Sequence, residues 1–307
     1  MKFIYFFLFN KKMPNLDDFL SSDEENFIDE ETIDENIHSK IAIVSYAMRF
    51  PGSELDENLF WKNLIEAKNF SRIITERLNF DDKLIQNERV YSTHGNTMKN
   101  FERFDHSFFG IGRVEAETMD PQQRISLEVG YETLHRAGYD KKTLIGSHIG
   151  VFIGQCMDDW ASLNHDINVY SGSSLSRSIT SNRISYCLGL TGPSMTIDTA
   201  CSSSLVAVNS GLNAIKENDC DTALVGGVNL ILSAKPYKAL CESKMLSIDG
   251  LCKTFDASAN GYVRGDGCAF VFLKKMIDTE IERDYVWATI EGIGSNQDGN
   301  SAVLTAP

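Results

Sequence analysis

Short apolar runs alternate with amphipathic segments along most of this chain. The runs that we expect to form buried strands lie at residues 41–44, 150–154, 195–199, 223–228 and 269–273. Between them, apolar residues recur at helical spacing, at Ile125, Val129 and Leu134 and again at Leu205, Val208, Leu212 and Ile215. Because strands alternate with helices, the pattern predicts an α/β fold, a sheet with helices covering both faces.

Local signals place some boundaries of these elements. Asp120-Pro121 marks the start of a helix, because proline is favoured in the first turn, and Gly138 suits its end. Residues 59–65 resemble two turns of an amphipathic helix. Residues 66–107 are mixed and polar, and we expect them to be rich in loops. No internal repeat and no clear second domain is visible.

The charge of the chain divides it into two parts. Its 307 residues carry a net charge of −14, which disfavours a nucleic acid as partner. Residues 1–39 contain ten acidic residues and three lysines. Like charges repel and little apolar surface is available there, so we expect residues 1–39 to be a disordered acidic leader. Residues 40–307 are expected to form the folded domain.

The cysteines and the N-terminal residues bear on the location of the protein. The number of cysteines, seven, is odd, and no two of them form a CxxC pair. This argues against a disulfide framework and against a zinc site, and favours a reducing compartment. The apolar run at residues 3–9 is too short to cross a bilayer and has no small-residue cleavage site after it. We therefore expect a cytoplasmic protein that is not embedded in a membrane.

Cys201 is the strongest candidate for chemistry. A helix over 202–216 would place this thiol at a helix N-terminus, where unpaired N–H groups and the helix dipole stabilise the nucleophilic thiolate. The Cys201 N–H could also donate to an oxyanion. The residues alone leave a second interpretation open, because a cysteine before a helix is more often an inert core thiol. Asp120, Glu128 and Asp256 are expected to cap a helix, form an ion pair and shape a turn rather than to catalyse.

Several further segments carry a family resemblance. In chain order they are Arg49-Phe50-Pro51-Gly52, Phe108-Phe109-Gly110-Ile111, Met119-Asp120-Pro121-Gln122-Gln123-Arg124, Asn182-Arg183-Ile184-Ser185-Tyr186, Asp198-Thr199-Ala200-Cys201-Ser202-Ser203-Ser204-Leu205, Gly226-Gly227-Val228-Asn229, Lys253-Thr254-Phe255-Asp256, Gly261-Tyr262-Val263-Arg264-Gly265-Asp266-Gly267 and Asn296-Gln297-Asp298-Gly299. With these segments, residues 40–307 resemble the N-terminal half of the β-ketoacyl synthases of type I polyketide synthases.

The resemblance implies both a fold and a reaction. The fold is thiolase-like, with two similar halves that each contain a mixed five-stranded sheet, layered αβαβα, so that one half is incomplete alone. It also implies a homodimer in which the strand leading to the nucleophile pairs with its twin. In the reaction, Cys201 accepts an acyl group from the phosphopantetheine of an acyl carrier protein. A malonyl extender on a carrier then loses carbon dioxide and attacks the thioester. No cofactor is bound directly.

One departure from the family pattern limits what we expect of this chain. All six histidines precede Cys201, and the two histidine segments that complete the family's catalytic triad are not in the sequence. His106, His135 and His165 match neither segment. We therefore expect acyl transfer to Cys201 but no condensation by this chain alone, and association through an exposed apolar face. The alternative is a non-catalytic fragment or pseudoenzyme that binds a full-length synthase or an acyl carrier protein. A smaller departure, Ser45-Tyr46-Ala47, is expected to perturb the turn after the first strand.

Overall fold

A mixed sheet of six strands forms the centre of the fold, in the order β5-β4-β6-β8-β1-β9. The computed structural model describes residues 40–53, 56–78, 90–163, 166–276, 284–297 and 299–300, so the acidic leader over 1–39 lies outside the described residues. The strands of this sheet are β1 (Ile41–Arg49), β4 (Ile149–Gly154), β5 (Ser194–Ile197), β6 (Thr222–Asn229), β8 (Gly267–Lys275) and β9 (Ala288–Ile290).

Three parallel strands form one part of this sheet, and strand direction alternates across the rest. β5, β4 and β6 run parallel to one another, whereas β8 is antiparallel to β6 and to β1, and β9 is antiparallel to β1. The expected mixed sheet is therefore confirmed, with β9 as a sixth strand beyond the expected five. β5 and β9 form its two edges.

Strand β1 is longer than the apolar run that predicted it. It continues through Ser45-Tyr46-Ala47 to Arg49, with a register shift between Ile43 and Ser45. The Ser45 hydroxyl is buried and donates to the Thr133 carbonyl at 2.7 Å. This serine therefore lies within the strand, with its polar group satisfied, and the expected perturbation of a turn was wrong.

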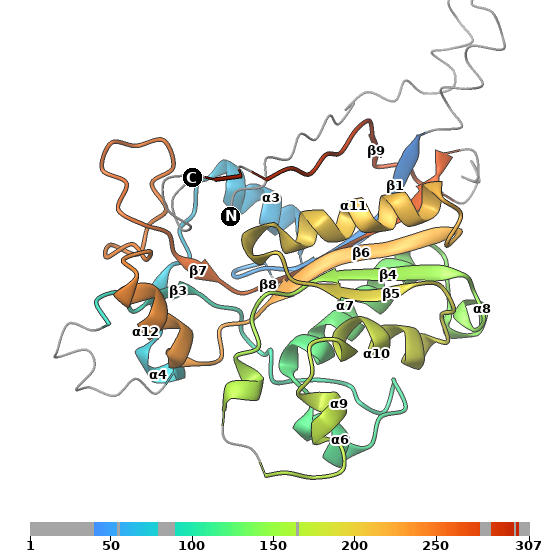
Figure 1. The fold of residues 1–307 in the computed structure, drawn as a ribbon, viewed down its shortest axis with the longest axis horizontal. Helices are drawn as coiled ribbons and strands as arrows, with labels where there is room; N and C mark the ends of the chain where they lie inside the picture. Colours follow the sequence, from blue (N-terminus) through green and yellow to red (C-terminus); the bar gives the residue numbers. More distant parts are fainter. Residues whose placement is uncertain are drawn as a thin grey trace, which may run out of the picture.

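Helices cover both faces of the sheet, as the sequence pattern predicts (Figure 1). Helix α11 (Ser203–Lys216) packs on β4 and β6, and helices α7 (Pro121–Arg136) and α10 (Ile179–Leu188) pack on the opposite face. Buried apolar side chains fill the space on each side of the sheet. The six-stranded sheet and these helices thus form one α/β unit of three layers.

The signals around residue 120 correctly mark the start of α7. The Asp120 carboxylate accepts a hydrogen bond from the Gln122 N–H at 2.8 Å, and Pro121 is the first residue of the helix. The predicted apolar face, Ile125, Val129 and Leu134, is buried against the sheet.

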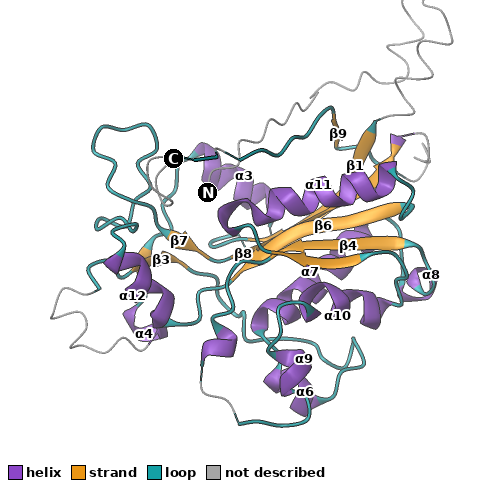
Figure 2. Cartoon of the chain, viewed as in Figure 1, coloured by secondary structure: helices purple, strands orange, loops and turns teal. Residues whose placement is uncertain are grey.

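A smaller lobe lies beside the sheet, on the left in Figure 2. Its three-stranded sheet has the order β2-β3-β7, and Tyr237 is buried at its core. Residues 66–107, expected to be rich in loops, supply three of its five short elements. The lobe contains β2 (Arg72–Ile73), α4 (Thr75–Leu78), β3 (His94–Asn96), α12 (Ala234–Glu242) and β7 (Arg264–Gly265).

Short peripheral helices complete the described structure. They are α3 (Glu57–Ile65), α6 (Arg113–Thr118), α8 (Lys141–Leu144), α9 (Ser171–Ser174) and the 3₁₀ turns Trp160–Ser162 and Ala200–Ser202. The helix expected at 59–65 is present as α3, but its apolar side chains are largely exposed, Trp61 by 59%. Among the described residues, no helix is both long enough and apolar enough to span a membrane.

Candidate active site

Cys201 lies at the junction of strand β5 and helix α11. It is the middle residue of the 3₁₀ turn Ala200–Ser202, and α11 begins at Ser203, one residue later than the sequence predicts. Its side chain is an exposed free thiol. The Cys201 N–H donates to no acceptor within the described part of the chain. Both the thiol and this N–H are therefore available to a ligand.

The backbone turn before the thiol is strained and held by hydrogen bonds. Ala200 has φ +56°, in the left-handed region that costs a residue with a Cβ atom of order 1 kcal/mol or more. The Asp198 carboxylate accepts from the Ala200 N–H at 3.0 Å. The Ser203 hydroxyl donates to the Ala200 carbonyl at 2.6 Å and accepts from the Thr199 N–H at 2.9 Å. The serines after the cysteine thus stabilise the turn that presents it.

Two glycines let the first turn of α11 approach the sheet. A Cβ atom on Gly154, at the end of β4, would lie 2.3 Å from the Ser204 nitrogen. A Cβ atom on Gly227, in β6, would lie 2.8 Å from the Ser204 Cβ. Both distances are shorter than a real Cβ contact, so only glycine permits this packing. The position of the thiol above the sheet therefore depends on both glycines.

Cys201 opens onto a cavity of about 440 Å³ with mostly apolar walls. Its lining includes Phe50, Cys156, Val208 and Val271. Burial raises the pKa of the Cys156 thiol, and the negative charges of Asp198 and Cys201 add to the rise. Cys268 also lines this cavity, and burial raises its pKa to about 12. Of the three thiols that share the cavity, Cys156 and Cys268 are thereby kept protonated, which leaves Cys201 as the candidate nucleophile.

The other carboxylates singled out from the sequence lie outside the lining of this cavity. Asp120 caps α7 as expected, and Asp256 shapes a turn by accepting from the Ser258 N–H at 2.7 Å. Glu128 was expected in an ion pair. It instead accepts from the Asp105 N–H at 3.4 Å, and burial raises its pKa.

No described histidine lines the Cys201 cavity. His106 Nδ1 is hydrogen-bonded to the Ile111 carbonyl at 2.7 Å, and His135 Nδ1 to the Tyr139 carbonyl at 3.2 Å. His165 lies outside the described residues. The two described candidates therefore form local structural hydrogen bonds and do not act as a base for Cys201.

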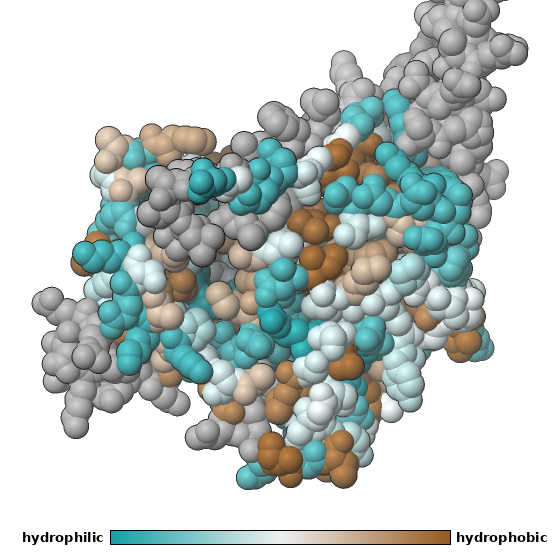
Figure 3. Space-filling model, viewed as in Figure 1, coloured by the Kyte–Doolittle hydropathy of each residue, from teal (hydrophilic) through white to brown (hydrophobic). Residues whose placement is uncertain are grey.

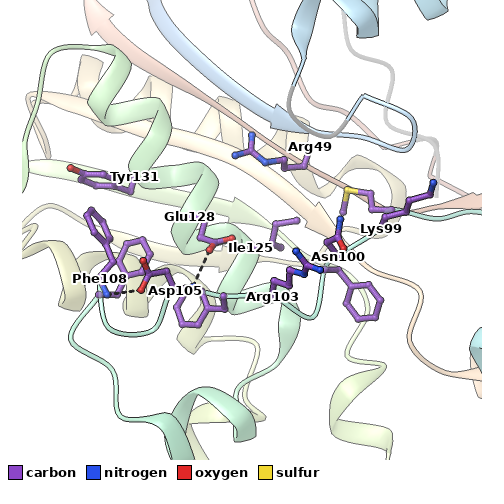
Figure 4. A pocket seen from close by; sticks show the side chains of 13 residues that line it. Arg49, Lys99, Asn100, Arg103, Asp105, Phe108, Ile125, Glu128 and Tyr131 are labelled. Atoms are coloured by element: carbon purple, nitrogen blue, oxygen red, sulfur yellow. Dashed lines mark hydrogen bonds between the residues drawn. The ribbon is translucent and has the colours of Figure 1, made fainter.

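A larger cavity, of about 770 Å³, lies on the α7 side of the sheet (Figure 4). Arg49, Arg103 and Glu128 lie around it, with aromatic side chains such as Phe108 and Tyr131. The Arg49 guanidinium is already paired with Glu132 at 2.5 Å. Because its lining includes no cysteine, serine or threonine, we do not assign covalent chemistry to this cavity. The described residues also include no cluster of metal-ligating side chains.

A strained turn that presents a thiol at the start of a helix, on a three-layered α/β half, is the arrangement expected of a thiolase-like fold. Residues 38–278 match the family described as β-ketoacyl synthase, N-terminal domain. This match covers most of the chain, so the chain belongs to the β-ketoacyl synthase family.

Individual relatives are polyketide synthases. The chain is 40% identical over 272 residues to polyketide synthase PksL of Bacillus subtilis, a match over 87% of the chain and 6% of that protein. It is 41% identical over 274 residues to orsellinic acid synthase of Beauveria bassiana, over 87% of the chain and 12% of that protein. The chain thus spans a small part of these much longer relatives.

Solved ketosynthase structures share the fold. The ketosynthase from module 6 of the bacillaene synthase of Bacillus subtilis matches with a TM-score of 0.76 and 38% identity, over 87% of this chain and 46% of that one. An oxazolomycin ketosynthase domain from Streptomyces albus matches with a TM-score of 0.78 and 31% identity, over 87% of this chain and 47% of that one. The chain spans about half of each, which agrees with the expected N-terminal half of a ketosynthase domain.

Proposed function

We propose that Cys201 accepts acyl groups as a thioester, in the acyl-transfer step of a polyketide or fatty acid synthase. The observation that carries the proposal is the exposed Cys201 thiol in a strained turn at the start of α11, beside a mostly apolar cavity. The helix N-terminus favours the thiolate, and the Cys201 N–H is one donor for the oxyanion formed during attack.

The transfer is a thioester exchange. The Cys201 sulfur attacks the acyl carbonyl, so that a new carbon–sulfur bond forms while the bond to the donor sulfur breaks. The proton of the Cys201 thiol passes to the departing thiolate. The donor we propose is phosphopantetheine on an acyl carrier protein, and the chain itself needs no bound cofactor.

Condensation with a malonyl-type extender is proposed for the synthase as a whole. That step needs groups that accept or stabilise charge on the extender. No histidine follows Cys201 in the sequence, and none of the described histidines lines its cavity. We therefore assign to this chain the acyl acceptor, and to the remainder of a synthase the groups that act on the extender.

A cytoplasmic homodimer is the setting we propose for this activity. All seven cysteines are free thiols, which suits a reducing compartment. β5 is an edge strand and leads directly into the Cys201 turn, so pairing with its twin would bring two active sites close together.

The first prediction is that the chain forms an acyl adduct at Cys201. The full chain is incubated with an acyl-pantetheine thioester and its intact mass is measured, followed by peptide mapping. We expect one acyl group on the wild-type chain, and none on Cys201→Ala because the acceptor sulfur is gone. Cys252→Ala is the matched control, since Cys252 is also an exposed free thiol. An adduct that persists in Cys201→Ala, or maps to Cys252, would refute the proposal.

A binding role without catalysis is the second candidate. It is favoured by the hydrophobic residues that gather on the surface over α11 in Figure 3. A folded chain that forms no acyl adduct but is retained on an immobilised full-length synthase or acyl carrier protein would favour this alternative.

A further inference from the structure

Arg177 connects the Cys201 turn to a different part of the fold. It lies in the loop between α9 and α10, 21 residues before Asp198. Its Nη1 donates to Asp198 Oδ2 at 2.5 Å and to the Cys156 carbonyl at 3.1 Å. Its Nε lies 3.8 Å from the Asp158 carboxylate. One guanidinium thereby connects the end of β5 to the segment that follows β4.

Asp198 links Arg177 to Ala200, the residue before the candidate nucleophile. While Oδ2 accepts from Arg177, Oδ1 accepts from the Ala200 N–H at 3.0 Å. Ala200 is the left-handed residue immediately before Cys201. A residue in that conformation persists only where its surroundings hold it. The Asp198 carboxylate provides one such restraint, and Arg177 fixes the orientation of the carboxylate.

The other polar contacts of the turn are internal to it. The hydroxyls of Ser202 and Ser203 bond to Thr199 and Ala200, within a few residues of chain. Such bonds shape the turn but do not orient it relative to β4. The Arg177 guanidinium contributes the charge-assisted bonds that reach across to the β4 segment, and such bonds are stronger than neutral ones.

We propose that Arg177 is a positioning residue for Cys201, acting through Asp198 on the turn that presents the thiol. The inference rests on the proposed function, because it assigns to Arg177 the orientation of the acyl acceptor. Arg177 need not touch the substrate. It holds the sulfur and the Cys201 N–H in the geometry required for attack, which is the kind of support that catalytic groups commonly need.

The test measures the reactivity of Cys201 directly. The full-length chain and its variants are treated with iodoacetamide, and the alkylation rates of Cys201 and Cys252 are obtained by peptide mapping. Cys252 is an exposed thiol outside the Cys201 turn, so the ratio of the two rates corrects for reagent and for global unfolding. We expect Arg177→Ala to lower this ratio roughly three- to tenfold, the range for a half-exposed charged contact. Arg177→Lys should recover part of the loss, since it keeps the charge.

A double-mutant cycle separates positioning from general destabilisation. Asp198→Asn keeps an oxygen for the Ala200 N–H and replaces the oxygen that accepts from Arg177. We expect it to lower the ratio by a similar factor, and Arg177→Ala to add little in the Asp198→Asn background. Arg113→Ala is the matched control, because Arg113 forms an exposed ion pair with Glu117 on α6.

Each outcome decides the inference independently of the proposed function. A wild-type ratio in folded Arg177→Ala overturns it, as do additive effects of the two substitutions. If Arg177→Ala does not fold, Asp198→Asn alone decides: a wild-type ratio overturns the inference and a lowered ratio supports it. Failure of the wild-type chain to take an acyl group refutes the proposed function instead, since alkylation needs no carrier.

Discussion

Asp120 is a carboxylate held almost wholly away from water at the start of α7. It is 4% exposed and accepts hydrogen bonds from the backbone and side chain of Gln122. Burial disfavours the charged form and raises the pKa of Asp120 to about 6, although the Gln122 bonds oppose the rise. A capping residue that the sequence marks as structural is therefore also a pH-dependent element of stability.

We predict that the contribution of Asp120 makes the wild-type chain lose stability as pH rises from about 4 to about 6, and that Asp120→Asn abolishes this loss. In this window the folded chain keeps a proton on Asp120 that the unfolded chain has released. The contribution of Asp120 to the free energy of unfolding therefore falls as pH rises, by about 3 kcal/mol in total, and is constant above the folded pKa. Chemical unfolding of both chains at a series of pH values should show the variant gaining relative to the wild type across this window.

Asp256→Asn is the control for this experiment. Hydrogen bonds from the Ser258 N–H and hydroxyl lower the pKa of Asp256. Its contribution is lost only as pH falls below about 4, so its difference from the wild type should be flat between pH 4 and pH 6. A flat difference for Asp120→Asn as well would contradict the raised pKa.

Sequence reasoning located the candidate nucleophile but not its support. Cys201 is recognisable because a small-residue turn before an amphipathic helix is a local pattern. Arg177 is not, because its contact with Asp198 depends on a loop conformation and leaves no periodic signal. The left-handed Ala200 was also missed, since alanine has no intrinsic preference for that conformation.

At the scale of elements, the sheet that α11 packs against determines the position of this helix. Gly154 ends β4 at the point where the backbone of α11 begins, and its missing side chain leaves space for Ser204. The Cys201 turn lies immediately before that contact. A change in this packing should therefore affect both stability and the reactivity of the thiol.

We predict that Gly154→Ala destabilises the fold by about 3 kcal/mol, because the new Cβ atom would overlap backbone atoms that have little freedom to move. Thermal unfolding measures the loss, and iodoacetamide mapping should show altered Cys201 alkylation. Gly172→Ala in α9 is the matched control, since nothing lies within 4 Å of its added Cβ atom. Equal stability of the two variants would show that the overlap is relieved at low cost.

The elements that the sequence predicted are those with strong apolar patterns. Five of the six strands of the central sheet, α7 and α11 were found, with errors of a few residues at their ends, whereas β9 was not. Helix α12 was not, because Lys235, Pro236 and Lys238 interrupt its apolar positions. Its local signal is the Ser233 hydroxyl, which accepts from the Lys235 N–H at 3.2 Å and caps the helix. Only packing against the smaller lobe identifies its apolar face.

At the scale of the whole molecule, two surfaces are available for association. One is the hydrophobic surface over α11 (Figure 3). The other is the edge strand β5. The carbonyls of Pro193 and Ile197 accept from Val151 and Gln155 of the β4 side, at 2.8 and 3.0 Å. By the alternation of a strand, the polar backbone groups of Ser194 and Thr196 point to the open edge, where a twin strand can pair.

We predict that Met195→Glu weakens a homodimer formed through β5. Met195 lies within this short strand and is 48% exposed. Antiparallel pairing of β5 with its twin brings the two copies of residue 195 near the symmetry axis, so two carboxylates would repel one another across it. Sedimentation equilibrium should give a dissociation constant at least about tenfold higher than that of the wild-type chain.

Ile248→Glu tests whether Met195→Glu weakens the dimer because of where it adds a negative charge, or only because it adds one. Ile248 is 57% exposed in the loop after α12 and is not part of β5, and the substitution changes net charge by the same amount. If it dissociates the dimer as strongly as Met195→Glu, the added charge on an already acidic chain is the cause and β5 is not the contact. If both variants keep the wild-type dissociation constant, association uses the surface over α11 instead. Dissociation by Met195→Glu alone would place the two Cys201 turns on either side of a shared strand pair.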